Sequence, residues 1–196
     1  MFSGIIENKG TVVEFLKLKD YRLGISTDLN YSSVKKGSSV SCNGVCLTVL
    51  SKKKISKNTV LYFDVSGETV NCTNFSEISV GDTINIEKSL RVGDEISGHF
   101  VFGHVDDTAK LLSIKKIGGS HELKIKISKN VQKYVAKKGS ISLNGVSLTI
   151  NNVKNDQISL NIISYTWNKT NFKKLNVGDR INLEVDMLAR YVTQNH

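Results

Sequence analysis

Three residues in the second half of the chain have side chains that could move protons: His104, Ser147 and Asp186. An imidazole can accept a proton near neutral pH, a hydroxyl can relay one, and a carboxylate can orient either group. The matching places in the first half of the chain hold Ile5, Cys46 and Ser89. These differences predict that one half mainly holds a ligand, whereas the other half also performs acid-base chemistry.

The matching places are defined by an internal duplication. Residues 80–87 read Val-Gly-Asp-Thr-Ile-Asn-Ile-Glu, and residues 177–184 read Val-Gly-Asp-Arg-Ile-Asn-Leu-Glu, 97 positions later (177 minus 80). Two further pairs of segments match in the same way, residues 43–49 with 144–150 and residues 69–75 with 166–172. A duplication that keeps Asn and Thr beside its apolar residues predicts two equivalent units, each with a core and a binding pocket.

Each of the three candidate residues also has a structural explanation. His104 could be a structural histidine, Ser147 a strand-end hydroxyl, and Asp186 the N-cap of a helix that begins at Met187. Their joint departure from the repeat favours a function, because a structural requirement should act on both copies alike. A Ser-His-Asp triad is disfavoured because no nucleophile-elbow sequence surrounds Ser147, and His99 could simply close a turn.

The composition argues against several classes of protein. The 196 residues carry a formal charge of +9, but the lysines lie in short scattered groups without interleaved aromatics, which indicates a solvated surface rather than a nucleic-acid interface. No apolar run approaches the ~20 residues of a membrane span, and the first residues do not resemble a signal peptide, so we expect a cytoplasmic protein. Cys42, Cys46 and Cys72 are too few for a disulfide framework or a zinc site, so we expect free thiols and no metal.

The elements that must position the candidate residues are mostly strands. Alternating apolar and polar residues predict strands at 62–65, 83–87, 123–127, 158–162 and 181–185. The Asn-Gly pairs at 43–44 and 144–145 predict hairpin turns between strands. Helical spacing predicts a helix from Ser128 to Gly139, a counterpart from Asp28 to Gly37 and a short terminal helix from Met187 to Val192. Strands at this spacing are typical of small closed barrels rather than of alternating strands and helices.

Five motifs together resemble the riboflavin synthase family. They are Met-Phe-Ser-Gly-Ile-Ile at 1–6, Asn-Gly-Val-Cys-Leu-Thr at 43–48, Gly-His-Phe-Val-Phe-Gly-His-Val at 98–105, Asn-Gly-Val-Ser-Leu-Thr at 144–149 and the paired Val-Gly-Asp stretches. The resemblance implies an all-β fold of two similar six-stranded Greek-key barrels in tandem, each with a short helix, followed by a short C-terminal helix. We therefore expect one lumazine-binding barrel at residues 1–97, a second at 98–186 and a helical tail at 187–196.

The resemblance also implies a reaction. Members of the family are transferases of riboflavin biosynthesis. Without a cofactor, they convert two molecules of 6,7-dimethyl-8-ribityllumazine into riboflavin and 5-amino-6-ribitylamino-2,4-pyrimidinedione by transfer of a four-carbon unit. Their working site lies between the first barrel of one subunit and the second barrel of another, which implies a homotrimer here and also an association with lumazine synthase. Two identical substrates with unequal roles would explain two similar pockets with different reactive groups.

The family motifs place the expected site residues on this chain. The catalytic candidates are His104, Ser147, Thr149, Asp186 and Cys46. The expected pocket of the first barrel is lined by Gly4, Ile5, Ile6, Cys46, Leu47, Thr48, Asp64, Val65, Ser66, Gly67, Glu68 and Thr69. The expected pocket of the second barrel is lined by Gly103, His104, Val105, Ser147, Leu148, Thr149, Asn161, Ile162, Ile163, Ser164, Tyr165 and Thr166, with Lys138 reaching across to the partner.

The expected roles follow from the reaction. His104, or a hydroxyl relayed by it, would remove a proton from the acidic C7 methyl group of the lumazine. Ser147 and Thr149 would position a water or polarise the ring, and Asp186 would orient Ser147 or stabilise positive charge. Cys46 would provide shape and a hydrogen bond rather than a covalent nucleophile.

Two departures from the family pattern affect these expectations. Tyr165 stands where the family carries Glu, although Glu68 is kept in the first half. The chain also stops at His196, whereas family members continue as a longer helix that holds a trimer.

The leading alternative function is that of a lumazine protein, which shares the duplicated fold and binds a lumazine or flavin without synthesis. A nucleic-acid-binding barrel is a second alternative, and it rests only on charge and β architecture.

Overall fold

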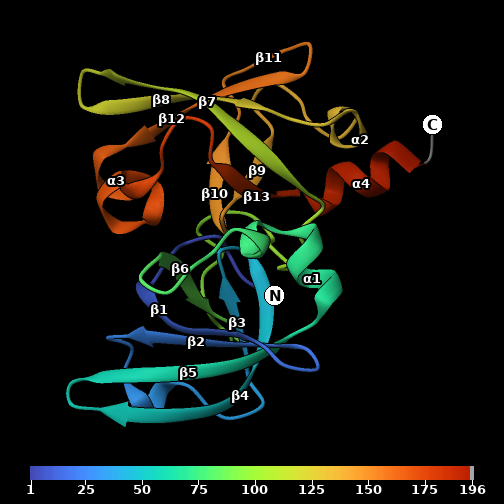
Figure 1. The fold of residues 1–196 in the computed structure, drawn as a ribbon. Helices are drawn as coiled ribbons and strands as arrows, with labels where there is room; N and C mark the ends of the chain where they lie inside the picture. The colour runs from blue at the N-terminus through green and yellow to red at the C-terminus, as the bar shows by residue number, and fades with distance from the viewer. Residues whose placement is uncertain (195–196) are drawn as a thin grey trace.

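The computed structural model describes residues 1–194 and arranges them as two β-rich halves stacked on each other (Figure 1). The first half is a closed barrel with the strand order β1-β2-β5-β4-β3-β6, in which all neighbours run antiparallel. Its strands are β1 (Asn8–Lys17), β2 (Tyr21–Thr27), β3 (Ser39–Cys42), β4 (Val45–Ile55), β5 (Asn58–Val65) and β6 (Thr83–Lys88).

The second half repeats this strand order as a sheet, β10-β9-β13-β7-β8-β12-β11. Its strands are β7 (Asp107–Ile117), β8 (Ser120–Lys126), β9 (Ser140–Leu143), β10 (Val146–Thr149), β11 (Asn152–Lys154), β12 (Gln157–Ile163) and β13 (Arg180–Val185). The strands β10 and β11 together take the place of β4 in the first half, because the strand is interrupted between Thr149 and Asn152 while the chain continues. The predicted duplicated, mostly β fold is therefore confirmed, with a break in the strand that closes the second barrel.

The helices are short and only partly match the prediction. The α-helices are α1 (Gly67–Cys72), α2 (Lys129–Gln132), α3 (Ser164–Lys169) and α4 (Met187–Gln194), and the 3₁₀ turns are η1 (Tyr31–Ser33), η2 (Asn74–Ser76) and η3 (Asn171–Lys174). The terminal helix is confirmed. The expected helix from Asp28 to Gly37 is wrong, because Asn30 caps η1 by accepting a bond from Ser32 N and the turn ends after three residues.

The expected helix from Ser128 to Gly139 is a single turn of α2. Ser128 occupies the N-cap position, but its hydroxyl makes no capping bond. Val131 is buried, and Tyr134 and Val135 pack against the same core, so the predicted apolar face is correct although the helix is shorter. The chain after α2 continues through turns in which Val135 and Gly139 donate to carbonyls three residues earlier.

Each half has its own hydrophobic core, which is built from the alternating apolar residues of its strands. One residue from each half packs on the core of the other half. Val105, which precedes β7, contacts the core of the first barrel, and Ile6, which precedes β1, contacts the core of the second. The segments that lead into β1 and β7 are thus exchanged between the two halves.

A network of buried asparagines joins the halves. It comprises Asn43, Asn74, Asn85, Asn144, Asn171 and Asn182. Asn85 Nδ2 donates to Asn171 Oδ1 at 3.0 Å, and Asn171 N donates to Asn85 Oδ1 at 2.7 Å. Such paired amides satisfy main-chain groups that would otherwise be buried without partners. The network explains why the repeat keeps Asn beside its apolar residues.

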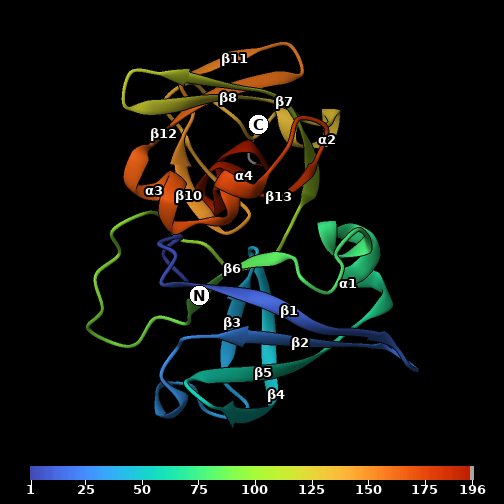
Figure 2. The same ribbon diagram turned by 60° about the vertical axis from the view of Figure 1, so that its left-hand side comes forward.

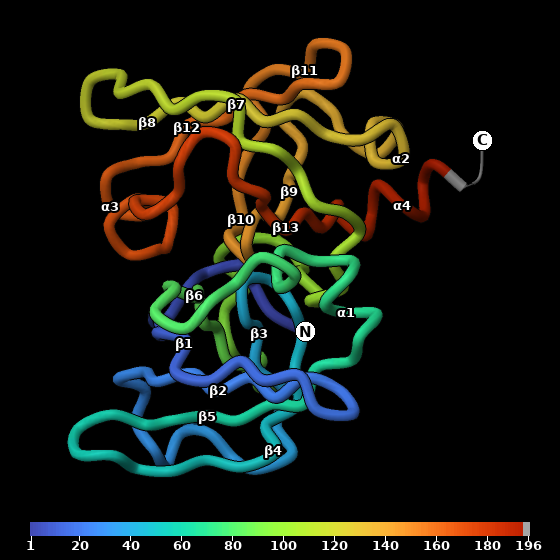
Figure 3. Tube along the Cα trace, viewed as in Figure 1, coloured from blue at the N-terminus to red at the C-terminus, as the bar shows by residue number. Residues whose placement is uncertain are grey.

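The Asn-Gly turns of the two halves touch at the same junction. Asn43 and Gly44 both have positive φ, 47° and 80°, as a two-residue hairpin of type I′ requires. A Cβ on Gly44 would lie 2.7 Å from Gly145 N, so only glycine allows the turns to approach this closely. Figure 3 shows the start of the chain, in blue, running along this junction, and Figure 2 shows the connection from β6 to β7 beside it. Phe2 and Val101 form an antiparallel bridge between these two segments.

Candidate functional site

The N-terminal segment lies against the strand that carries Ser147. Ser147 N donates to the carbonyl oxygen of Gly4 at 2.8 Å. Gly4 has a φ of 77°, and a Cβ there would lie 2.6 Å from Ser147 Cβ. Glycine is therefore required at this position for two reasons: the backbone is left-handed, and the two segments approach each other closely.

The equivalent contact in the other direction joins Gly103 and Cys46. Cys46 N donates to the carbonyl oxygen of Gly103 at 2.9 Å. Gly103 has a φ of 78°, and a Cβ there would lie 2.6 Å from Cys46 Cβ. His104 follows directly, with its side chain exposed, so the segment that carries His104 covers the first barrel.

The backbone contacts of these segments cross between the halves, unlike the grouping expected from the sequence. The expectation placed Gly4, Ile5 and Ile6 in the pocket of the first barrel and Gly103, His104 and Val105 in that of the second. The structure places the first of these segments beside Ser147 and the second beside Cys46. We call the surface around Ser147 with Gly4 the Ser147 pocket, and the surface around Cys46 with Gly103 the Cys46 pocket. Of the repeat-breaking residues, His104 therefore follows the segment that lies beside Cys46, whereas Ser147 lies beside Gly4.

The partner of Ser147 is His99. His99 Nδ1 and Ser147 Oγ share a hydrogen bond of 2.7 Å, and His99 Nε2 is buried without a protein partner among the described residues. Gly98 permits this contact, because a Cβ at that position would lie 2.8 Å from Ser147 Cβ and 2.1 Å from the carbonyl oxygen of Ser3. Burial lowers the pKa of His99, and the charge of Asp186 opposes that shift. The imidazole is thus held in its neutral form at neutral pH.

Asp186 has the structural role considered for it. Its Oδ1 accepts a bond from Leu188 N at 3.0 Å, so the carboxylate caps the first turn of α4. Within residues 1–194, no hydrogen bond joins Asp186 to Ser147, and Asp186 acts on the site through its charge on His99.

The sequence comparison missed His99 for a simple reason. The repeat pairs Gly4 with Gly103, so the position equivalent to His99 falls before Met1 and no mismatch can mark it. The only available signal was its place in the Gly-His-Phe-Val-Phe-Gly-His-Val stretch, where it precedes His104 by five residues (104 minus 99).

The remaining expected pocket residues divide into outward-facing and buried positions. Cys46 and Thr48 face outward on β4, and Ser147 and Thr149 face outward on β10. The side chains of three expected contacts are buried in the cores instead, namely Leu47, Val65 and Ile162. Only the main chain of these three residues can face a ligand.

The helices that follow β5 and β12 differ between the halves. In α1, Ser66 Oγ accepts a bond from Thr69 N, and Glu68 accepts one from the Cys72 thiol. In the second half, Ile163, which precedes α3, and Tyr165 within α3 are exposed, and Ser164 Oγ donates to Gly119 O. Asp64 forms an ion pair with Arg22. Lys138 is exposed and has a φ of 70°. The other expected positions in these sets are Gly67, Leu148, Asn161 and Thr166.

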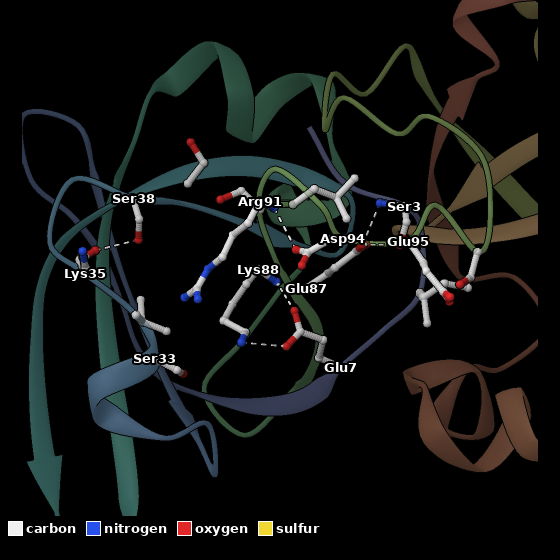
Figure 4. A pocket seen from close by; sticks show the side chains of 16 residues that line it. Ser3, Glu7, Ser33, Lys35, Ser38, Glu87, Lys88, Arg91, Asp94 and Glu95 are labelled. Atoms are coloured by element: carbon white, nitrogen blue, oxygen red, sulfur yellow. Dashed lines mark hydrogen bonds and ion pairs between the residues drawn. The ribbon is translucent and has the colours of Figure 1, made fainter.

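A hollow of about 1030 Å³ lies elsewhere, beside the end of β6 and the segment that follows it (Figure 4). Charged side chains of both signs surround it, including Glu7, Lys88 and Arg91. Ser3, Ile5 and Glu87 also line it, but Cys46 and Thr48 do not. The hollow therefore shares Ile5 with the pocket that the family motifs predict in the first barrel, but not Cys46 or Thr48.

Three further features concern metal binding, membrane spans and thiols. Among residues 1–194, no group of three or more His, Cys, Asp or Glu side chains is arranged to hold a metal ion. The helices of this part of the chain are too short or too polar to cross a membrane. All three cysteines are free, and burial raises the pKa of the Cys42 thiol.

Comparison with known proteins gives a consistent picture. The lumazine binding domain model matches residues 3–89 and again residues 102–186. Riboflavin synthase of Photobacterium phosphoreum is 36% identical over 194 residues, which cover 98% of this chain and 87% of that protein. Riboflavin synthase of Chlamydia pneumoniae is 38% identical, covering 97% and 92%, and that of Bacillus subtilis is 34% identical, covering 98% and 88%.

Solved structures agree with this pattern. LumP complexed with riboflavin matches with a TM-score of 0.85 and 28% identity, covering 94% of this chain and 99% of that chain. LumP complexed with 6,7-dimethyl-8-(1'-D-ribityl) lumazine matches over the same fractions with a TM-score of 0.80 and 26% identity.

Proposed function

The chain belongs to the riboflavin synthase family, transferases with duplicated lumazine-binding domains, and from this premise we propose that it converts two molecules of 6,7-dimethyl-8-ribityllumazine into riboflavin and 5-amino-6-ribitylamino-2,4-pyrimidinedione. The observation that carries the proposal is the hydrogen bond between Ser147 and His99, which puts a neutral imidazole behind a hydroxyl in one of two equivalent pockets. The other pocket has Cys46 at the same place.

The stoichiometry of the reaction fits a site made of protein groups alone. The four-carbon unit leaves one lumazine and joins the other, and the two products together contain the same atoms as the two substrates. No external oxidant or reductant is therefore needed. What the protein must supply is a base and two binding surfaces that hold the substrates in the correct orientation, because oriented reactants gain effective molarity.

We assign the base to the Ser147 pocket. Ser147 Oγ takes a proton from the C7 methyl group of the bound lumazine while its own proton passes to His99 Nδ1. The carbanion that forms is stabilised by delocalisation into the pteridine ring. Asp186 favours the imidazolium that results, because its charge raises the pKa of His99.

The Cys46 pocket then holds the second lumazine. Cys46 and Thr48 face outward on β4, and the backbone of Gly103 and His104 lies beside them. We assign these residues to binding and orientation, with His104 as a hydrogen-bonding group at the edge of this pocket. This differs from the initial expectation that His104 is the base.

The two pockets must meet for the transfer to occur. We propose that the chain acts as a homotrimer in which the Cys46 pocket of one copy faces the Ser147 pocket of another, with Lys138 reaching the neighbour. The functional units are residues 1–97, 98–186 and 187–196, and the exposed residues Leu188, Tyr191 and Val192 of α4 are candidates for the contact between copies. Sedimentation analysis at several concentrations tests the trimer, and a mixture with lumazine synthase tests the proposed association.

The decisive experiment is direct. Purified chain is mixed with 6,7-dimethyl-8-ribityllumazine, and riboflavin formation is followed by its absorbance. Steady formation of riboflavin supports the proposal. Tight binding of lumazine or riboflavin without turnover would support instead a protein that holds the ligand, which the structural similarity to LumP favours as a second candidate.

A further inference from the structure

Glu184 is a buried carboxylate that faces the main chain of the segment ahead of β7. Its Oε1 accepts a bond from Phe102 N at 2.7 Å, and its Oε2 accepts bonds from Gly103 N at 2.9 Å and His104 N at 3.2 Å. Both oxygens are used, and the residue is only 3% exposed. A buried charge without a cation beside it needs such donors to remain stable.

Glu87 is the equivalent residue of the first half, and it holds the N-terminal segment in the same way. Its Oε1 accepts bonds from Ser3 N at 2.7 Å and Ser3 Oγ at 2.9 Å, and its Oε2 accepts one from Gly4 N at 3.0 Å. Figure 4 shows Ser3 and Glu87 side by side at the wall of the hollow. The two halves therefore keep the same carboxylate in the same role.

The held segments do not serve the half to which the carboxylate belongs. Glu184 lies on β13 of the second half, but Gly103, which it holds, accepts the bond from Cys46 N of the first half. Glu87 lies on β6 of the first half, but Gly4, which it holds, accepts the bond from Ser147 N of the second. Each carboxylate is thus one glycine away from the opposite pocket.

We propose that Glu184 and Glu87 are positioning residues that act crosswise: Glu184 sets the geometry of the Cys46 pocket, and Glu87 sets that of the Ser147 pocket. Each acts through the backbone of the glycine that it holds. The inference concerns the pockets of the proposed function and rests on that function, although its central contacts are independent of turnover.

The electrostatic setting of the two residues supports this role. Burial raises the pKa of Glu184 to about 7 against the effect of its three N–H donors, and the neighbouring Asp106, which is itself paired with Arg190 of α4, raises it further. Burial also raises the pKa of Glu87, and Glu7 adds to that effect. Among residues 1–194, no ion pair is formed by either carboxylate, and each is satisfied by groups of the segment it holds: three N–H groups for Glu184, and two N–H groups and the Ser3 hydroxyl for Glu87. The arrangement of the two carboxylates is therefore best explained by the segments they fix.

The neutral amide variants give a sharp test, because both oxygens are engaged. Gln at position 184 must point an NH₂ group at one of the three N–H donors, which weakens the hold on the segment. Glu87→Gln makes the same change opposite two N–H donors and the Ser3 hydroxyl. These two variants are matched controls for each other, since they make the same change at equivalent places.

Cysteine alkylation can report on each pocket separately. In a Cys72→Ser background, Cys46 is the accessible thiol, because Cys42 is buried. Its rate of reaction with iodoacetamide, followed by mass spectrometry, reports on the Cys46 pocket. A second reporter, Ser147→Cys in a Cys46→Ser and Cys72→Ser background, gives the same measurement for the Ser147 pocket.

The expected result is a crossed pattern. Glu184→Gln should raise the alkylation rate of Cys46 by about tenfold, because weaker hydrogen bonds let the held segment open locally. The alkylation rate of the thiol introduced by Ser147→Cys should stay within about twofold of its value without Glu184→Gln. Glu87→Gln should have the reverse effect. Equal changes at both reporters, or a change confined to the pocket of the same half, would overturn the proposal.

A variant that fails to fold does not end the test. Glu184→Asp and Glu87→Asp keep the charge but shorten the reach, and they should give the same crossed pattern in weaker form; its absence would count against the proposal equally. Alkylation in the presence of riboflavin tests the proposed function separately. If riboflavin slows the alkylation of neither reporter thiol, the assignment of the two ligand pockets is wrong. The crossed effect of the Glu184 and Glu87 variants is measured without any ligand and is tested by those rates alone.

Discussion

Ser147 Oγ lies 2.7 Å from Nδ1 of His99, a residue that enters the site from the connection between the two halves. His99 N donates to the carbonyl oxygen of Ser3 at 3.2 Å, so the imidazole is held by the same N-terminal segment that contacts Ser147. Hydroxyl, imidazole and N-terminal backbone thus form one connected unit, and the first two predictions concern its chemistry.

Ser147→Ala and His99→Gln should each lower turnover by about 100-fold, the usual size of a lost acid-base contribution, while riboflavin still binds. Turnover is measured by riboflavin absorbance and binding by quenching of riboflavin fluorescence. Because the two residues act as one unit, the double variant should lose little more than either single variant. Additive losses in the double variant would contradict a shared role.

The pH dependence of turnover should report the neutral form of His99. Its pKa is lowered by burial from the ordinary value of 6.5, so the base stays unprotonated as the pH falls below that value. The acidic fall of kcat/KM is therefore expected below pH 6.5. His104→Gln should keep this limb, whereas a limb that shifts only in His104→Gln would return the role of base to His104.

Cys46→Ser should retain turnover within about tenfold. A hydroxyl already occupies the equivalent place in the other half, and the variant removes no group that we assign to acid-base catalysis. The expected loss is in binding, through the shape of the Cys46 pocket. If the variant abolishes turnover while Ser147→Ala remains active, the thiol takes part in the chemistry and the two pockets exchange roles.

The asparagine network should contribute strongly to stability. Asn85→Ala leaves Asn171 N and the carbonyl of Asn144 buried without their partners, which is expected to lower the free energy of unfolding by about 2–4 kcal/mol. Urea denaturation measures the change. Asn152→Ala, at an exposed position of β11, is the control and should alter stability by less than about 0.5 kcal/mol.

Two glycines with similar backbone angles separate strain from close contact. Gly37 has a φ of 81° with open space around it, and Gly103 has a φ of 78° with Cys46 Cβ 2.6 Å from the position of a Cβ. Gly37→Ala should cost only the backbone term, about 1 kcal/mol, whereas Gly103→Ala should cost clearly more and disturb Cys46. Equal losses of stability in the two variants would show that the contact with Cys46 is unimportant.

Much of the architecture could be predicted from local patterns. Alternation over residues 181–185 identified β13 within one residue, and the Asn-Gly pairs identified the hairpins because only a few residues accept positive φ there. The helices were harder to predict. Both α1 and α3 are six residues long, too short for an apolar period to emerge, and the pattern at 28–37 predicted a helix where local polar caps give a turn.

The site illustrates the difference most clearly. The duplication alone determined that Cys46 and Ser147 are equivalent and that His104 has no counterpart of its own kind. It did not determine which half each segment covers, because a repeat compares positions and carries no information on which surface a strand pairs with. The tertiary structure decided that, through the hydrogen bonds from Ser147 to Gly4 and from Cys46 to Gly103. These bonds join residues that are far apart in the sequence, and they form only when the two halves pack so closely that side chains at Gly4 and Gly103 would collide with the opposite strand.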